Sequence, residues 1–183
     1  MRASLQEPDG FSYADEFMDR ATEDNLLAYL STLVFEPVTM RGNTAKRMVR
    51  HFGLRYDYAS RTLREAETIP RQLKPQIRRA ERFAGLSEGA IVEALVNRYP
   101  PGAGVGWHND ADVYKTIVGI SLGSGCSIQF KTKDAGELQT FEKHLMPRSA
   151  YIMRDDVRDK WQHRIPPTKN ERYSLTLRSL SAA

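Results

Sequence analysis

The amino-acid sequence predicts an α+β fold that is mainly β. In this fold, early helices pack on one sheet of a double-sheet sandwich, of which the jelly roll is one form. Two observations lead to this prediction. Residues 1–85 contain two stretches in which apolar residues recur at helical spacing. From residue 91 onward the pattern changes to short strand-like segments, separated by the turn sequences PPGAGVG, GSG, KDAG and PPTKNE.

Each of the two predicted helices carries one apolar face. The first runs from Thr22, whose hydroxyl can cap the first turn, to Leu33. The second runs from about Pro70 to Phe83, with its proline near the first turn, where a missing N–H group leaves no hydrogen bond unmade. The inward faces consist of Leu26, Leu27, Leu30 and Leu33 in the first helix and of Leu73, Ile77, Ala80 and Phe83 in the second.

Seven short strands are predicted after residue 90, each bounded by a turn. They are expected at Ile91–Tyr99, Thr116–Ser121, Ser127–Lys131, Leu138–Lys143, Ala150–Arg154, Gln162–Ile165 and Tyr173–Arg178. Because no repeat or linker interrupts the chain, we expect residues 1–183 to form a single domain.

The composition excludes several classes of protein. No run of about 18 apolar residues occurs, so we expect no membrane span. The first residues contain no apolar segment typical of a secretory signal. Cys126 is the only cysteine, which rules out a disulfide within the chain and fits a cytoplasmic location. No feature of the sequence requires a protein partner.

Positive charge is concentrated in residues 41–82. The net charge is +4 and the isoelectric point is near 9.2. The cations of this basic stretch are Arg41, Lys46, Arg47, Arg50, Arg55, Arg61, Arg64, Arg71, Lys74, Arg78, Arg79 and Arg82. Such a face attracts a nucleic-acid backbone, although on charge alone a solvated basic surface explains it equally well.

A metal site is indicated by His108 and Asp110, which follow a glycine-rich turn. In an extended segment the side chains of residues i and i+2 point the same way, so both can reach one ion. Imidazole and carboxylate are two of the three ligands in the facial triad that holds non-haem Fe(II). A His-x-Asp pair arises easily by chance, so it needs a structural context.

That context comes from residues 172–178. Tyr173, Leu175 and Leu177 form an apolar face, and the opposite face consists of Arg172, Ser174, Thr176 and Arg178. A half-exposed strand with its polar side in water is the commoner arrangement. A sandwich that encloses a small dicarboxylate instead needs such a face turned inward, because guanidinium groups bind carboxylates with two parallel hydrogen bonds.

Two histidines compete for the place of the third metal ligand. His163 lies on a short predicted strand directly before the arginine-bearing strand, so the two can share one cavity. His144 lies beside charged neighbours and before a turn, as a surface residue does. Placement favours His163.

Four elements then occur in a specific order: Asn97-Arg98-Tyr99-x-Pro101-Gly102, His108-x-Asp110, His163, and Arg172-Tyr173-x-Leu175-Thr176-x-Arg178. Together they resemble the AlkB family of nucleic-acid dealkylating dioxygenases, over about residues 91–180. The resemblance implies a double-stranded β-helix, which is a jelly-roll form. It also implies that Fe(II) is bound by His108, Asp110 and His163.

The resemblance further implies how the cosubstrate 2-oxoglutarate is held. Arg172 is expected to grip its distal carboxylate, with a hydroxyl added by Tyr99. Asn97 and Arg178 are expected near the carboxylate closest to the metal. The family often has asparagine two residues after the first arginine, whereas this chain has Ser174, which keeps a hydroxyl but loses the amide.

The implied reaction is oxidative demethylation or other dealkylation of N-alkylated bases in DNA or RNA, with O2 consumed and aldehyde, succinate and CO2 released. A base must be single-stranded or flipped out to reach the metal. Residues His51–Tyr58 are similar to the family's substrate lid, with Tyr56 as the stacking candidate and Asp112 as a base-edge contact. On this basis residues 1–85 hold the helices and the lid, and residues 86–183 form the jelly-roll core. Ordinary strand packing explains the aromatic residues of the lid equally well.

Two other functions fit parts of the pattern. The same metal chemistry can act on a protein side chain or a small molecule, because the triad does not encode the substrate. A jelly-roll binding module without catalysis is the other alternative, but all three triad residues are present. The basic stretch and the Arg172–Arg178 pair favour the nucleic-acid substrate.

Overall fold

The computed structural model describes residues 7–40, 43–134 and 136–180. Its helices are α1 (Arg20–Leu30), α2 (Lys74–Ala84) and α3 (Asp155–Asp159). Its strands are β1 (Phe11–Ala14), β2 (Glu36–Met40), β3 (Asn43–Asp57), β4 (Thr62–Glu65), β5 (Ile91–Tyr99), β6 (Val105–His108), β7 (Tyr114–Leu122), β8 (Cys126–Asp134), β9 (Glu137–Leu145), β10 (Ala150–Met153), β11 (Gln162–Ile165) and β12 (Arg172–Leu180).

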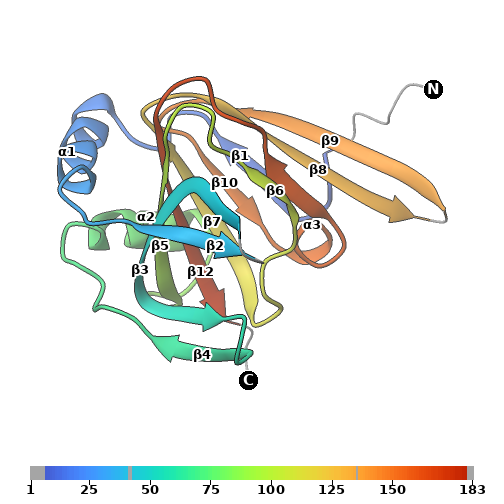
Figure 1. Ribbon diagram of the computed structural model, residues 1–183, viewed down its shortest axis with the longest axis horizontal. Coiled ribbons are helices and arrows are strands. Elements are labelled where there is room, and N and C mark those ends of the chain that lie inside the picture. Colours follow the sequence, from blue (N-terminus) through green and yellow to red (C-terminus); the bar gives the residue numbers. More distant parts are fainter. Residues whose placement is uncertain (1–6, 41–42, 135, 181–183) are drawn as a thin grey trace.

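The strands form two antiparallel sheets. The larger sheet has the order β1-β10-β7-β12-β5-β3-β2, with β4 paired to β3, and the smaller has the order β6-β11-β8-β9. In Figure 1, α1 and α2 lie at one side of the molecule and the β8–β9 hairpin extends away from the other. The prediction of a mainly β double-sheet fold with helices on one sheet is confirmed.

Two apolar cores lie on opposite faces of the larger sheet. The first joins α1 and α2 to this sheet and includes Leu30, Leu73 and Leu175, all of which are fully buried. The second lies between the two sheets and includes Ile117 and Phe130. Strand β12 separates the cores as its alternation predicted, because its apolar residues face the helices and its arginines face the space between the sheets.

Both helix starts differ from the sequence-based predictions. Helix α1 is capped by Asp19, whose Oδ1 accepts a hydrogen bond from the Thr22 N–H at 2.7 Å, so the prediction of Thr22 as the cap is wrong. A carboxylate at this position also interacts favourably with the helix dipole. The helix ends at Leu30, before Leu33, because Ser31 and Thr32 direct their hydroxyls back to the carbonyls of the last turn.

Helix α2 begins at Lys74, four residues after the predicted start. Pro75, and not Pro70, occupies the first turn. The helix ends one residue beyond the prediction, where Gly85 adopts a left-handed φ of 66°. The predicted inward face is confirmed: Leu73, Ile77 and Ala80 are buried, and Phe83 packs against the same core.

Strands β1, β2, β3, β4 and β6 were not predicted from the sequence. Strand β3 is the most consequential, because its pairing with β5 places Val49 opposite Asn97. It thereby places part of the basic stretch one strand away from the arginine-bearing strand β12, with β5 between them. Arg41 lies outside the described residues.

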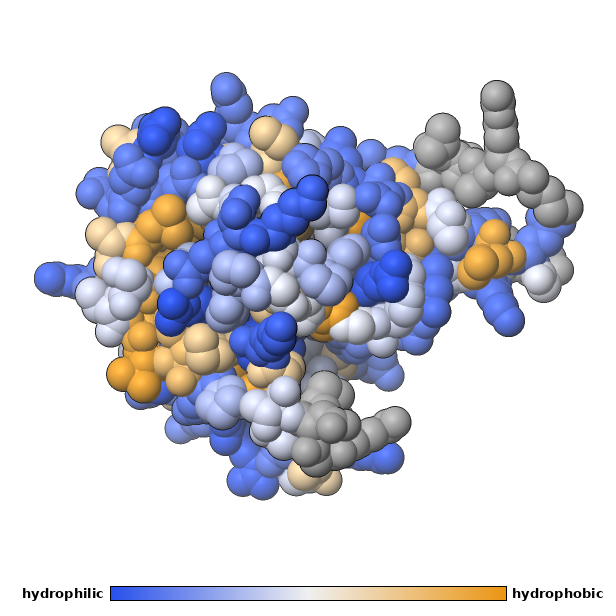
Figure 2. Space-filling model, turned by 45° about the horizontal axis from the view of Figure 1, so that its top comes forward, coloured by the Kyte–Doolittle hydropathy of each residue, from blue (hydrophilic) through white to orange (hydrophobic). Residues whose placement is uncertain are grey.

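The outer surface is largely hydrophilic on the face shown in Figure 2, and apolar surface gathers on the side that carries α1. Val34, in the segment after α1, is 75% exposed. Within the described ranges, no helix combines the length and the apolar character that a membrane crossing requires.

Candidate metal and cosubstrate site

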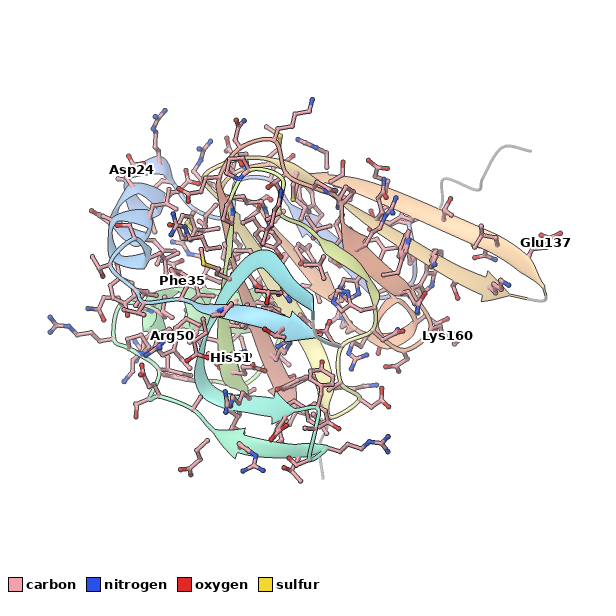
Figure 3. All side chains as sticks on the ribbon, viewed as in Figure 1. Asp24, Phe35, Arg50, His51, Glu137 and Lys160 are labelled. Atoms are coloured by element: carbon pink, nitrogen blue, oxygen red, sulfur yellow. The ribbon has the colours of Figure 1, made fainter. Side chains whose placement is uncertain are left out.

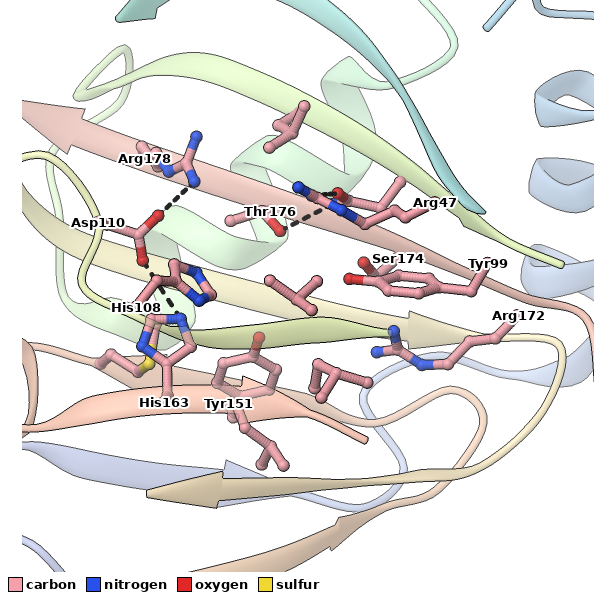
Figure 4. Close-up of a pocket in the computed structure, with 16 residues that line it drawn as sticks. Arg47, Tyr99, His108, Asp110, Tyr151, His163, Arg172, Ser174, Thr176 and Arg178 are labelled. Carbon is pink, nitrogen blue, oxygen red and sulfur yellow. Dashed lines mark hydrogen bonds and ion pairs between the residues drawn. The ribbon is translucent and has the colours of Figure 1, made fainter. Parts of the chain in front are cut away.

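A polar cavity lies between the two sheets. Strands β5 and β12 of the larger sheet contribute Asn97, Tyr99, Arg172 and Arg178, and the smaller sheet contributes His108 and His163. Figure 4 shows two ends: a histidine and carboxylate cluster at one, and Arg172 at the other. The cavity thus gathers the predicted metal ligands and the predicted anion-binding residues in one space.

His108, Asp110 and His163 converge at the first end, here called the metal end. His108 on β6 and His163 on β11 are register partners, with ring centroids 4.3 Å apart. His163 Nε2 lies 3.4 Å from Asp110 Oδ2. One ligand atom from each residue lies within 4.8 Å of the others, and this is the only such group found in the described part of the chain.

The orientation of His108 is fixed by the backbone. Its Nδ1 lies 2.8 Å from the Gly106 carbonyl oxygen, to which it can donate a hydrogen bond, and this leaves Nε2 available as a ligand. His144 lies elsewhere: it is exposed on β9, opposite Ser127. The structure therefore brings His163, and not His144, together with His108 and Asp110.

The ionisation of the metal end suits a cation. Burial raises the pKa of Asp110, but the positive charges of Arg178, the two histidines and Arg158 together outweigh this, so the pKa lies well below its ordinary range. Burial lowers the pKa of His163 to about 4. A carboxylate and a neutral imidazole are the forms that bind divalent metals.

Arg158 holds the loop that carries Asp110. This arginine is buried, and it donates from Nε to the Tyr114 carbonyl at 3.1 Å and from Nη2 to the Asp110 carbonyl at 3.3 Å. Its contacts fix both ends of the segment between β6 and β7. The sequence around α3 carries no pattern that marks Arg158 as a buried residue, and it was missed.

The second end of the cavity, here called the anion end, is built around Arg172. Only 1% of this residue is exposed. Its guanidinium lies 5.1 Å from the centre of the Tyr99 ring, and its Nε donates to Ser121 Oγ at 3.0 Å. Its Nη1 is buried and has no hydrogen-bond partner. A buried guanidinium with an unused donor fits a carboxylate ligand, because burying it unpaired is costly.

Asn97 lies between the two ends and has two partners. Its Oδ1 accepts a hydrogen bond from Arg47 Nη1 at 2.6 Å, and its Nδ2 donates to Thr176 Oγ1 at 3.2 Å. Arg47 comes from β3 and also lines the cavity. Sequence reasoning placed Arg47 only in the basic stretch, because the pairing of β3 with β5 was not predicted.

Tyr151 on β10 is a further lining residue that the sequence did not reveal. It lies between the two ends in Figure 4. Its ring packs directly on Gly119, where a Cβ atom would approach the ring to 2.2 Å. Gly119 was the signal available in the sequence, because a glycine within an apolar strand often marks a place where another group approaches the backbone closely.

The predicted substrate-contact residues lie outside the cavity wall. Tyr56 sits on the β3–β4 hairpin opposite Leu63, with its ring edge-on to Tyr58 at 4.9 Å. Asp112 is exposed in the segment between β6 and β7. Tyr58 has a largely exposed ring, yet burial of its hydroxyl and then the charge of Asp110 raise its pKa.

Comparison with known proteins identifies the class. The family model of the 2OG-Fe(II) oxygenase superfamily matches residues 13–178. The chain therefore belongs to the 2OG-Fe(II) oxygenase superfamily. It is an oxygenase of the type that uses Fe(II), 2-oxoglutarate and O2, and its His-Asp-His group fits iron.

Curated relatives narrow the class to AlkB-like proteins. Mus musculus tRNA (carboxymethyluridine(34)-5-O)-methyltransferase ALKBH8 is 31% identical over 129 residues, covering 67% of this chain and 19% of that protein. The Arabidopsis thaliana alkylated DNA repair protein ALKBH8 homolog is 28% identical over 149 residues, covering 68% and 43%. Uncharacterized protein L905 of Acanthamoeba polyphaga mimivirus is 42% identical over 80 residues, covering 42% and 37%. The resemblance to the AlkB family is confirmed, although the chain spans less than half the length of each relative.

Solved structures confirm the jelly-roll fold. The structure of OsALKBH1 superposes with a TM-score of 0.69 at 16% identity, covering 97% of this chain and 100% of that one. A Burkholderia pseudomallei 2OG-Fe(II) oxygenase family protein gives 0.66 at 20% identity, covering 93% and 85%. A Pseudomonas putida prolyl-4-hydroxylase gives 0.64 at 15% identity, covering 94% and 93%. Since these include different reactions, the likeness concerns the fold alone.

Proposed function

We propose that this chain removes alkyl groups oxidatively from nucleic-acid bases, with Fe(II) held by His108, Asp110 and His163. One observation carries the proposal: a His-Asp-His group, with Asp110 and His163 buried and His108 half-buried, shares its cavity with Arg172, whose buried Nη1 has no partner. A metal and a carboxylate can therefore be bound at the two ends of one enclosed space, which is what a chelating oxo-acid cosubstrate needs.

The cosubstrate would be held by residues along the cavity. Arg172 is placed to bind the distal carboxylate of 2-oxoglutarate, and Tyr99 lies against the same guanidinium. Asn97 and Arg178 would serve the carboxylate at the metal. Both terminal nitrogens of Arg178 already bind carboxylates, so its remaining buried donor, Nε, is the one free for the cosubstrate.

When bound, the metal and the cosubstrate supply the oxidant that hydroxylates an alkyl carbon attached to a base nitrogen, after which the product releases an aldehyde. The protein keeps Asp110 ionised and His163 neutral, and it orients the cosubstrate through Arg172. The apolar lining, which includes Leu95, Ile128 and Ile165, limits the access of water to the reacting atoms.

The nucleic-acid substrate is supported by the ALKBH8 relatives and by the basic stretch. The names of those relatives refer to tRNA and to alkylated DNA, so either polymer is a candidate. Arg47 and Arg50 place this charge on β3, which carries Tyr56 near its end and is followed by Tyr58 in the turn to β4. We infer that a flipped or single-stranded base stacks on Tyr56, with Asp112 at its edge.

The proposal is tested by loading the protein anaerobically with Fe(II) and adding 2-oxoglutarate, O2 and methylated single-stranded DNA or RNA. Formaldehyde and succinate should form in equal amounts. Succinate without demethylation of either polymer would point to a protein or small-molecule substrate. Absence of both Fe(II) binding and succinate would reject the proposal.

A further inference from the structure

Glu93 on β5 is a fully buried acid that is neither a proposed metal ligand nor a proposed cosubstrate contact. It is 0% exposed. Across the ladder its register partners are Arg178 on β12 and Gly53 on β3. Its Oε2 accepts a hydrogen bond from Arg178 Nη1 at 3.1 Å, and its Oε1 lies 2.9 Å from His51 Nδ1. Both oxygens are therefore engaged.

Arg178 is shared between two carboxylates. Its Nη1 binds Glu93, and its Nη2 donates to Asp110 Oδ1. The other oxygen, Asp110 Oδ2, faces His163 Nε2 at 3.4 Å. The two oxygens of Asp110 thus have different surroundings: one binds the guanidinium and the other points to the metal end (Figure 4). This arrangement favours metal binding through one oxygen only.

Two buried carboxylates, Asp110 and Glu93, bind the same Arg178 guanidinium, and Arg158 is a second buried cation near Asp110. Because burial keeps water away, both acids compete for the same guanidinium at short range. Glu93 therefore limits how strongly Arg178 withdraws electron density from Asp110.

The remaining contacts hold this pair in place. His51 lies on β3, beside Arg50 (Figure 3). It reaches Glu93 from a partly exposed position. The Arg178 guanidinium also lies over the Tyr114 ring, 4.9 Å from its centre. A line of contacts thus runs from His51 through Glu93 and Arg178 to Asp110.

We propose that Glu93 is a positioning residue for the metal site, and that His51 supports it. Glu93 holds Arg178 on one oxygen of Asp110, leaves the other oxygen for the metal, and adds a negative charge that strengthens metal binding. This inference rests on the proposed role of Asp110 as a ligand. Its closest chemical parallel is the hydrogen-bonded carboxylate that tunes a metal ligand from outside the coordination sphere.

The test is the variant Glu93→Gln, which keeps the shape of the side chain and removes its charge. Mn(II) binding is measured by titration calorimetry under anaerobic conditions, with Fe(II) binding followed by the charge-transfer absorption that appears with 2-oxoglutarate. We expect the affinity for Mn(II) to fall by roughly 10-fold or more, the range found for outer-sphere partners. Glu171→Gln is the matched control, because Glu171, directly before β12, pairs with Arg98 of β5 at the surface.

A purely structural role would lower the melting temperature and leave metal affinity unchanged, and that result would overturn the inference. If Glu93→Gln does not fold, His51→Gln gives the second test. It loosens Glu93 from a partly exposed site, so a smaller loss of Mn(II) affinity is expected, and wild-type affinity would count against the inference. Asp110→Ala separates the two proposals: if it retains full Mn(II) binding, the ligand assignment itself fails.

Discussion

The metal end and the anion end of the cavity differ in whether the buried arginine is paired with carboxylates before any ligand binds. At the metal end, Arg178 binds both Asp110 and Glu93, and only its Nε has no partner. At the anion end, Arg172 donates a hydrogen bond to Ser121 and lies beside the Tyr99 ring, yet its Nη1 has no hydrogen-bond partner.

The difference indicates how each end works. Paired charges keep the metal ligands close to their binding geometry without the metal, so little reorganisation is needed. At the anion end, the positive charge of Arg172 is buried beside a hydroxyl and a ring, so binding of an anion both fills and stabilises the cavity. Substitutions at the two ends should therefore have separable effects.

The largest effect is expected from Asp110→Ala. The variant removes one ligand and leaves Arg178 without half of its pairing, so metal affinity should fall by more than about 100-fold, beyond the range of outer-sphere changes. Turnover should be abolished. Mn(II) titration and succinate formation measure the two effects. Asp156→Ala, which removes a surface acid paired with Lys160, is the control. Normal activity of Asp110→Ala would show that the ligand assignment is wrong.

Arg172→Ala should weaken the binding of 2-oxoglutarate and leave metal binding unchanged. Loss of a charge-assisted hydrogen bond worth about 1.5–3 kcal/mol should raise the KM for 2-oxoglutarate by about 10- to 100-fold. Metal affinity should stay at the wild-type value, because Arg172 lies at the other end of the cavity. Arg98→Ala, on the outer side of the neighbouring strand, should change neither quantity. A parallel loss of metal affinity would contradict the independence of the two ends.

Gly119→Ala tests the packing of Tyr151, which lines the cavity between the metal end and the anion end. An added Cβ atom would meet the Tyr151 ring at 2.2 Å, so the ring must move or the strands must separate. We expect a loss of about 1–3 kcal/mol in the free energy of unfolding, as is typical of overpacking. Thermal or urea unfolding measures it. Gly106→Ala is the matched control, since nothing lies within 4 Å of its added Cβ. Equal stability of the two variants would refute the packing argument.

The smallest effect is expected from Tyr99→Phe. The ring beside Arg172 remains and only the hydroxyl is lost, so the KM for 2-oxoglutarate should rise by about 2- to 10-fold, the equivalent of one ordinary hydrogen bond. Tyr173→Phe serves as the control, because Tyr173 faces the helices. An unchanged KM would mean that the Tyr99 hydroxyl takes no part in cosubstrate binding.

The sequence predicted the residues of β12 and their two faces because strict alternation over seven positions leaves one consistent arrangement. It also predicted that His163 would join His108 and Asp110 in one place, and the register between β6 and β11 brings them together. Both depend on local patterns, namely the spacing of polar residues within a strand and the order of strands along the chain.

Most of the residues that the sequence did not reveal are placed by contacts between distant parts of the chain. Glu93 could have been recognised, because it shares the parity of Asn97 and Tyr99 in a predicted strand. Its partner His51 lies 42 positions away, and no local pattern connects the two. Arg47 and Arg158 resemble surface cations in sequence, and only the folded chain shows that one lines the cavity and the other is buried. Asp19 was missed because Thr22 is also a good capping residue.

Strand β3 pairs with two different strands along its length. It pairs with β5 up to Gly53 and with β4 from Leu54 onward. Arg47 and His51 belong to the first part, and Tyr56 belongs to the second. Residues 54–65 therefore lie outside the ladder that pairs β3 with β5 beside the metal. Under the proposed function, a protein engineer who exchanges this hairpin would alter which substrates are admitted and leave the residues of the oxidation chemistry in place.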